Sequence, residues 1–140
     1  MLTVRIKENQ YKSFIKYATE NCDSFSLVFE KDSFHDIYYQ LSEFALHKKN
    51  IGYHPDSGTF FENSELILYD CNKFTKSILQ SEYNLINCFD EKFPSEICFY
   101  RKGIKWFLCI SHEKYLFIYD ETKKDVSFFN EVGIEYWRSI

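Results

Sequence analysis

The hydrophobic residues near the start of the chain follow first a helical period and then a strand period. Four of them recur at i, i+3, i+4 and i+7, which places them on one face of a helix. This pattern predicts a helix from about Glu8 to Glu20 with the core face Tyr11, Phe14, Ile15 and Ala18. From Ser24 to Lys31 apolar residues alternate with other residues, and this alternation predicts a strand.

Two further helical stripes follow the predicted strand. The first predicts a helix from Phe34 to about Lys49, and Asp32 or Ser33 can cap its start. The expected core face of this helix is Phe34, Ile37, Tyr38, Leu41, Phe44 and Ala45. The second stripe predicts a shorter helix over residues 72–80 that buries Phe74, Ile78 and Leu79. Two glycines and one proline in residues 52–58 favour a loop, and the apolar run in residues 65–70 favours a strand. Residues 83–93 show no clear pattern.

The last third of the chain predicts an antiparallel meander. Its three strands cover residues 96–101, 104–111 and 114–120, with Lys102-Gly103 as the first tight turn. One register places Phe99 opposite Trp106, Ile97 opposite Leu108, Leu108 opposite Phe117 and Trp106 opposite Tyr119. We therefore predict one α+β domain over residues 1–140. It combines this three-stranded meander (about 96–120) with one or two N-terminal strands and about three helices.

Both faces of the predicted meander are apolar, although an antiparallel sheet usually leaves one face to water. The second face carries Cys98, Tyr100, Phe107, Cys109, Leu116 and Ile118. The protein's own helices can cover both faces, or one face can meet a partner. One such partner is a second copy of the chain, which would make the protein a homodimer.

Composition and charge narrow the classes of function. The chain has no apolar stretch that would serve as a signal peptide, and its five cysteines lack paired spacing, so we expect a cytoplasmic protein with reduced thiols. The net charge is −4, and the segment from Glu20 to Asp70 alone carries −7, with ten acidic and three basic residues. A nucleic-acid-binding protein would show a basic stripe instead. We therefore expect neither nucleic-acid nor membrane binding.

Motifs for catalysis, metals and cofactors are missing from the pattern. The four histidines, His35, His47, His54 and His112, are far apart and lack metal-ligand spacing. The four glycines form neither a dinucleotide-binding nor a phosphate-binding loop. No nucleophile signature surrounds any cysteine, so we expect no catalytic residue, no metal and no cofactor.

Aromatic residues set among carboxylates are the most informative surface pattern. Tyr39 lies off the core face of the second predicted helix, near Asp36 and Glu43, where it is either a partner anchor or part of a second buried stripe. The loop from Tyr53 to Phe61 either covers the core or binds a partner. We predict that the partner-binding residues are Asp32, Asp36, Tyr39, Glu43, Asp56 and Glu62.

The chain resembles the small bacterial immunity proteins of contact-dependent and polymorphic toxin systems. The resemblance is carried by the acidic segment Glu20 to Asp70, the aromatic stretch GIKWFLCISHEKYLFIYDE (Gly103 to Glu121) and the final GIEYW (Gly133 to Trp137). It implies a cytoplasmic inhibitor that binds one cognate toxin, often a basic nuclease, and occludes its active site. The alternative is a small enzyme or ligand-binding domain. Its aromatic pocket would lie between the meander and the helices, with Tyr100 or His112 among its polar groups.

Overall fold

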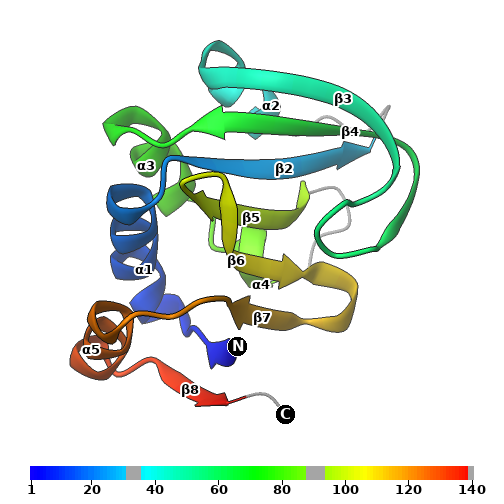
Figure 1. Cartoon of the computed structure of the whole chain (residues 1–140). Coiled ribbons are helices and arrows are strands. Elements are labelled where there is room, and N and C mark those ends of the chain that lie inside the picture. Colours follow the sequence, from blue (N-terminus) through cyan, green and yellow to red (C-terminus); the bar gives the residue numbers. More distant parts are fainter. Residues whose placement is uncertain (31–35, 88–93, 139–140) are drawn as a thin grey trace.

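The computed structural model describes residues 1–30, 36–87 and 94–138, apart from the side chain of His112. These residues form an α+β fold with one eight-stranded antiparallel sheet and five helices (Figure 1). The strands are β1 (Leu2–Arg5), β2 (Ser24–Glu30), β3 (Ala45–Tyr53), β4 (Phe60–Asp70), β5 (Ser95–Arg101), β6 (Ile104–Ile110), β7 (Tyr115–Ile118) and β8 (Glu135–Arg138). The helices are α1 (Glu8–Asn21), α2 (Asp36–Leu41), α3 (Lys73–Gln80), α4 (Asn84–Asn87) and α5 (Lys123–Val132).

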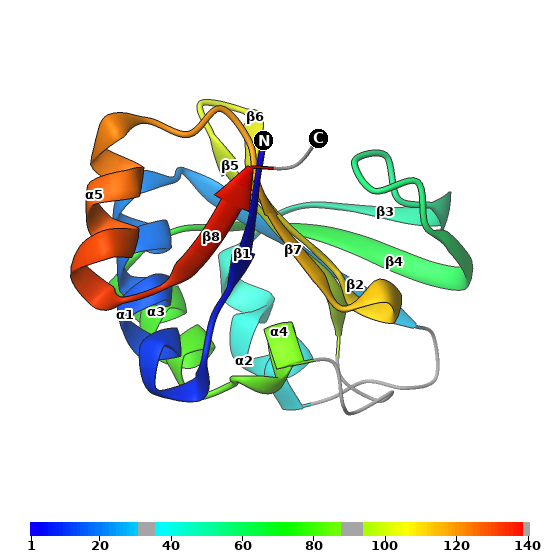
Figure 2. The ribbon, with the colours of Figure 1, turned by 90° about the horizontal axis from the view of Figure 1, so that it is seen from below.

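The strand order in the sheet is β3-β4-β2-β5-β6-β7-β1-β8. The five helices lie on one side of this sheet, and the loop that joins β3 to β4 curls over the other side (Figure 2). We call the helix-covered side the inner face and the opposite side the outer face. The predicted α+β class is confirmed, but the sheet is much larger than the predicted meander with one or two added strands.

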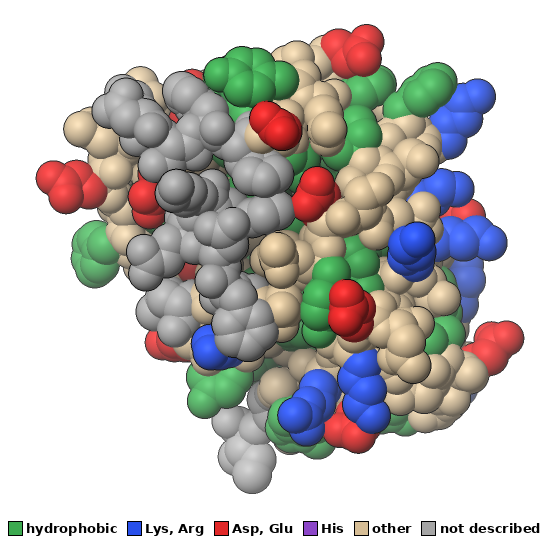
Figure 3. Space-filling model, turned by 180° about the vertical axis from the view of Figure 1, so that it is seen from behind, with side chains coloured by type: hydrophobic (Ala, Val, Ile, Leu, Met, Phe, Trp, Pro, Cys, Tyr) green, Lys and Arg blue, Asp and Glu red, His purple; other side chains and the backbone are tan. Residues whose placement is uncertain are grey.

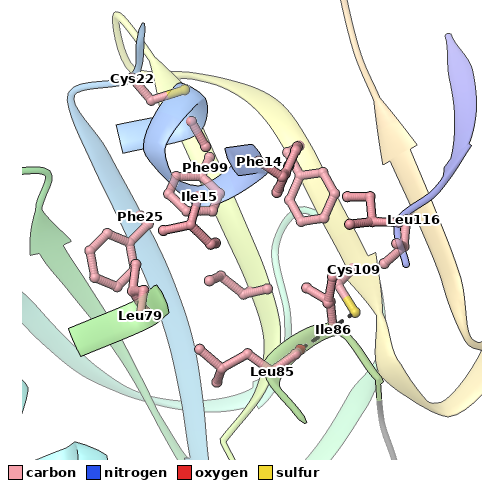
Figure 4. Close-up of a cluster of buried hydrophobic side chains, with 14 of the residues drawn as sticks. Phe14, Ile15, Cys22, Phe25, Leu79, Leu85, Ile86, Phe99, Cys109 and Leu116 are labelled. Atoms are coloured by element: carbon pink, nitrogen blue, oxygen red, sulfur yellow. Dashed lines mark hydrogen bonds between the residues drawn. The ribbon is translucent and has the colours of Figure 1, made fainter. Parts of the chain in front are cut away.

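The inner face holds the main hydrophobic core, and α1 is packed at its centre. All four predicted core residues of this helix are at most 1% exposed. Phe14 lies against three strand residues, with ring centroids 6.5 Å from Phe99, 6.0 Å from Trp106 and 4.9 Å from Phe107. Figure 4 shows α1 side chains meeting residues of β2, β5, α3 and α4 in this layer. Large rings explain how a thin layer of helices buries one whole side of the sheet.

A buried carboxylate joins α5 to the core. Asp125 accepts two hydrogen bonds from Arg101, at 3.1 and 3.0 Å, and others from the side chains of Tyr17 and Trp106. It also accepts the backbone N–H of Thr122, whose hydroxyl caps the start of α5 in return. Burial alone would raise the pKa of Asp125, but these hydrogen bonds outweigh it and lower the pKa to about 2. The charge of Asp125 therefore fixes α5, α1 and β6 to one another.

The prediction of one helix from Phe34 to Lys49 is wrong. The helix α2 begins at Asp36 and ends at Leu41, a short 3-10 turn covers Ser42–Phe44, and β3 begins at Ala45. The helical stripe ends with Phe44 and Ala45, since His47, Lys48 and Lys49 do not continue it. The backbone there pairs with β4 instead, and charged side chains suit such an edge strand because they hinder pairing with other chains.

The predicted register of the meander is correct at one turn and shifted at the other. Leu108 pairs with Phe117 as predicted, but Phe99 pairs with Phe107 rather than Trp106. Trp106 is the extra residue of a bulge, and its indole N–H reaches Asp125 at 3.0 Å. The bulge brings both Trp106 and Phe107 into the inner-face core. Leu108, which follows it, is buried but lies outside that core cluster.

The structure differs from the sequence-based prediction at three further places: β1, α3 and the segment 83–93. The sequence pattern missed β1, which pairs with β7 and with β8, the strand at the far edge of the sheet. Phe74 of α3 is 56% exposed rather than buried, and Thr75 and Leu79 face the core. Within the unassigned segment 83–93, the structure describes α4, and residues 88–93 lie outside the described residues.

Candidate functional site

The loop between β3 and β4 is fastened onto the outer face of the sheet. Asp56 accepts a 2.7 Å hydrogen bond from the Tyr100 hydroxyl of β5. The Lys105 ammonium of β6 donates to the backbone oxygen of Asp56 at 3.3 Å. The Thr59 hydroxyl donates to Glu96 of β5 at 2.9 Å. Figure 1 shows this loop curling back towards β5 and β6. The loop is therefore an ordered cover, which is one of the two roles expected for it.

His54 organises the loop from within. Its Nδ1 accepts the backbone N–H groups of Asp56 at 3.0 Å and Ser57 at 3.3 Å, and the side chain is fully buried. Burial lowers the pKa of His54 and outweighs the opposing effect of Asp56. The neutral ring then carries its proton on Nε2, which finds no hydrogen-bond partner among the described residues. The loop thus depends on an uncharged histidine.

Tyr100 links the loop to the sheet as a neutral donor. Its hydroxyl oxygen also lies 3.2 Å from Ser26 Oγ of β2. Burial is the main reason that the pKa of Tyr100 rises far above its usual value. Burial likewise raises the pKa of the neighbouring Cys98 thiol to about 12. Neither group is activated as a nucleophile or base near neutral pH.

A cavity of about 250 Å³ lies on the outer face beside the fastened loop. Its wall combines hydroxyl groups with apolar side chains, namely Ser24, Ser26, Tyr100, Pro55, Leu66 and Leu68. Gly103 of the β5–β6 turn and the basic side chains His47 and Lys49 of β3 complete the described lining. The alternative function predicts a pocket between the sheet and the helices, and around Phe14 this layer holds packed aromatic rings. Tyr100 does line a cavity, on the opposite face of the sheet.

Two aromatic side chains stand exposed where the β3–β4 hairpin ends. Tyr53 and Phe60 are cross-strand partners, and they are 61% and 87% exposed. Directly opposed residues of an antiparallel pair project to the same side of the hairpin. We call residues 53–62 the hairpin tip. Its charged residues are Asp56 and Glu62, and it contains no Lys or Arg.

The predicted partner-binding residues fall into two separate groups. Asp36, Tyr39 and Glu43 are exposed on α2 and the 3-10 turn after it, on the inner-face side of the sheet. Tyr39 is 63% exposed, so it is not part of a second buried stripe. Asp56 and Glu62 belong to the hairpin tip, and Glu62 is exposed. Asp32 lies outside the described residues. The five residues that the structure describes therefore lie in two places, one on each side of the sheet.

Aromatic side chains also stand exposed on the helix side of the molecule. Phe74 of α3 stacks on Phe44 with ring centroids 6.0 Å apart, and Tyr39 contacts Tyr38 edge to face. On the side seen in Figure 3, Lys and Arg side chains lie along one edge and at the bottom, and Asp and Glu side chains are scattered without forming a single patch.

The sequence pattern did not reveal the cavity. Ser24 and Ser26 alternate with the core residues Phe25 and Leu27, and this alternation was the available signal for small polar groups on the outer face. His47 and Lys49 could not be placed beside them, because their segment was predicted as a helix. The long-range pairing of β3 with β4 brings His47 and Lys49 to the same face of the sheet as Ser24 and Ser26 of β2.

The described part of the chain offers no cluster of metal ligands. No three of its His, Cys, Asp or Glu side chains come together as they would around a metal ion. Cys22, Cys71, Cys98 and Cys109 form no disulfide with one another, and Cys88 lies outside the described residues. No described helix has the length and apolarity needed to cross a bilayer.

Neither the protein-family models nor the curated proteins nor the solved structures with which the chain was compared include a match.

Proposed function

We propose that the protein is a non-catalytic protein-binding module, and specifically an immunity protein that inhibits a cognate toxin by covering its active site. The observation that carries the proposal is the exposed pair Tyr53 and Phe60 on a fastened hairpin. Large aromatic side chains are the commonest anchors of protein interfaces. The partner lies against the hairpin tip.

The order of the hairpin tip supports this role. Binding costs less conformational entropy when a loop already holds its bound shape. The tip is held by Tyr100, Glu96 and Lys105 from the sheet, and by the buried ring of His54 from within. Gly58 takes the positive φ of 75° that the turn requires, and its N–H bonds to the backbone oxygen of His54. These contacts fix the backbone of the loop between Tyr53 and Phe60 before any partner arrives.

Charge at the hairpin tip indicates the kind of partner. The carboxylates there are Glu62, which is exposed, and Asp56, which is engaged by Tyr100. A basic partner would be steered towards this end of the molecule at low ionic strength. A nuclease-type toxin, whose surface must attract nucleic acid, has this character. The inhibitor would then occupy the surface on which the nucleic acid binds.

The proposal is tested by capturing the partner from the native host and assaying its activity. We expect a basic protein that is retained at low salt, released at high salt and inhibited by the added protein. Charge reversal separates the two groups of predicted residues. Glu62→Lys should slow association at low salt, whereas Asp36→Lys with Glu43→Lys should have little effect, since these residues lie on the other side of the sheet.

Three results would contradict the proposal. One is a captured protein whose activity is unchanged in the complex, since inhibition is the function proposed. Another is an effect of Asp36→Lys with Glu43→Lys that exceeds the effect of Glu62→Lys. The third is a concentration-dependent homodimer that buries the hairpin tip, because a second copy would then be the partner. Sedimentation of the purified chain over a range of dilutions tests this last case.

A further inference from the structure

The cavity on the outer face points to a second ligand of different chemistry from a protein partner. From its lining we infer that it binds a small organic acid, with a carboxylate on a compact apolar body. This inference does not rest on the protein-binding function, because it uses the cavity rather than the exposed pair Tyr53 and Phe60. Three features of the cavity support the inference: its size, the chemistry of its two walls and one ammonium group in its lining.

The size of the cavity suits a small molecule. Its volume of about 250 Å³ lies just below the ~300–1,000 Å³ that is usual for drug-sized ligands. A single ring with a short acidic substituent fits this space, whereas a nucleotide or a dinucleotide exceeds it.

The two walls of the cavity differ in chemistry. Leu66 and Leu68 of β4 and Pro55 of the loop supply apolar surface for the body of a ligand. Hydroxyl groups of Ser24, Ser26 and Tyr100 line the cavity as well. The Tyr100 proton is committed to Asp56. The hydroxyl of Ser24 makes no hydrogen bond within the described part of the chain, so it is the donor open to a ligand. A ligand with an apolar body can pack against the leucines and the proline, and its acceptor group can take a hydrogen bond from a hydroxyl of the lining.

The charge of the lining favours an anion over a cation. Lys49 and His47 are the titratable basic residues of the described lining, which contains no Asp or Glu. Asp56, beside the cavity, accepts the Tyr100 hydroxyl, and the Lys105 ammonium lies against its backbone oxygen. The Lys49 ammonium, by contrast, makes no ion pair with a residue that the structure describes. A carboxylate is the natural partner of an ammonium beside hydroxyl donors.

The strand β3 provides a matched control for Lys49. Successive strand residues point to opposite faces, so Lys48 lies on the inner side of the sheet. Its ammonium sits 5.4 Å from the centroid of the Tyr38 ring of α2. The substitutions Lys49→Gln and Lys48→Gln thus remove the same charge from neighbouring positions, and only the first removes it from the cavity.

The test is an amide NMR titration of the full chain with benzoate and phenylacetate, compared with their neutral amides. We expect saturable shifts at Ser24, Ser26, Leu66 and Leu68 for the acids, and at least severalfold weaker binding of the amides. Lys49→Gln should weaken benzoate binding roughly fivefold, and Lys48→Gln should leave it unchanged. Ser24→Phe, which fills the cavity, should abolish binding, and the Tyr53→Ala/Phe60→Ala variant should keep it.

Several outcomes would overturn the inference. One is the absence of saturable shifts for both acids at millimolar concentration. Another is equal binding of benzoate and benzamide, because the ammonium would then play no role. A third is equal weakening by Lys49→Gln and Lys48→Gln, which would indicate a general charge effect. None of these outcomes bears on capture of a protein by the hairpin tip, so the two proposals fail separately.

Discussion

The two faces of the sheet are built in different ways. The inner face is closed by five helices and filled with interlocking rings around Phe14, and a buried carboxylate, Asp125, joins its elements. The outer face has a thinner cover. Val28, Cys98 and Leu108 are buried there outside the main core, beneath a loop that is held by a few hydrogen bonds.

We infer from this difference that the inner face mainly stabilises the fold and that the outer face and the hairpin tip bind ligands. Side chains of the inner face pack against one another, so they expose little apolar surface to a ligand. The outer face has a cavity, an ammonium group beside it and exposed aromatic rings at the hairpin tip. Binding residues commonly lie on loops that a rigid scaffold positions. The helix-covered core is the scaffold here, and the hairpin is the positioned element.

The sharpest contrast is expected from two Phe→Ala substitutions on opposite sides. Phe14→Ala should lower the free energy of unfolding by about 3–5 kcal/mol, because it opens a cavity in the ring cluster. Phe60→Ala should change it by less than about 0.5 kcal/mol, since Phe60 is 87% exposed. Urea unfolding of both variants measures the difference. Similar losses in the two variants would mean that the hairpin tip is part of the folding core.

Removal of the charge of Asp125 should have the next largest effect. Asp125→Asn should cost about 2–3 kcal/mol, because it leaves Arg101 without its carboxylate partner. The pKa of Asp125 is lowered to about 2 from its usual 3.8, so the stabilisation that the charge provides is complete above about pH 4. It is lost as the pH falls towards 2. Urea unfolding across this range should show a steeper fall for the wild type than for Asp125→Asn.

Asp120→Asn is the control for this measurement, since Asp120 is an exposed carboxylate close to the same helix. It should change neither the stability nor its slope with pH. A slope in Asp125→Asn equal to that of the wild type would show that other carboxylates cause the acid sensitivity.

The smallest expected effect concerns the histidine of the loop. Because burial lowers the pKa of His54, the unfolded chain binds a proton first as the pH falls below about 6.5. The stabilisation by the neutral ring is therefore lost on acidification, and hydrogen exchange of residues 54–59 should become faster. His54→Asn should remove this pH dependence, because an amide oxygen can accept the same backbone N–H groups without titrating. Faster exchange that persists in His54→Asn would assign the effect to another group.

Much of the inner face could be predicted from the sequence, and most of the outer face could not. The helical spacing of Tyr11, Phe14, Ile15 and Ala18 identified α1 and its buried face, because local periodicity reports burial directly. The Lys102-Gly103 turn was also predicted, and both residues take the positive φ that such turns require. The bulge at Trp106 depends on Asp125, which is distant in sequence, so no local pattern revealed it.

The candidate site was also only partly predictable, because local sequence patterns do not report contacts between distant segments. Asp56 and Glu62 were predicted as partner-binding residues, and both lie in the hairpin tip, where their binding role stays a prediction. The edge strand β3 looked helical because Phe44 and Ala45 extend the stripe of α2, while its pairing with β4 is a nonlocal property. The cavity forms only where β2, β3, β4 and β5 meet the loop. No sequence window contains these elements together.

The most direct test of the account compares two double variants in capture of the partner from the native host. Tyr53→Ala/Phe60→Ala removes the exposed rings of the hairpin tip, and Tyr39→Ala/Phe74→Ala removes exposed rings from the helix side. The account predicts that the first variant loses the partner by roughly tenfold or more while the second retains it. Loss of capture by the second variant with retention by the first would place the binding surface on the helices and contradict the account.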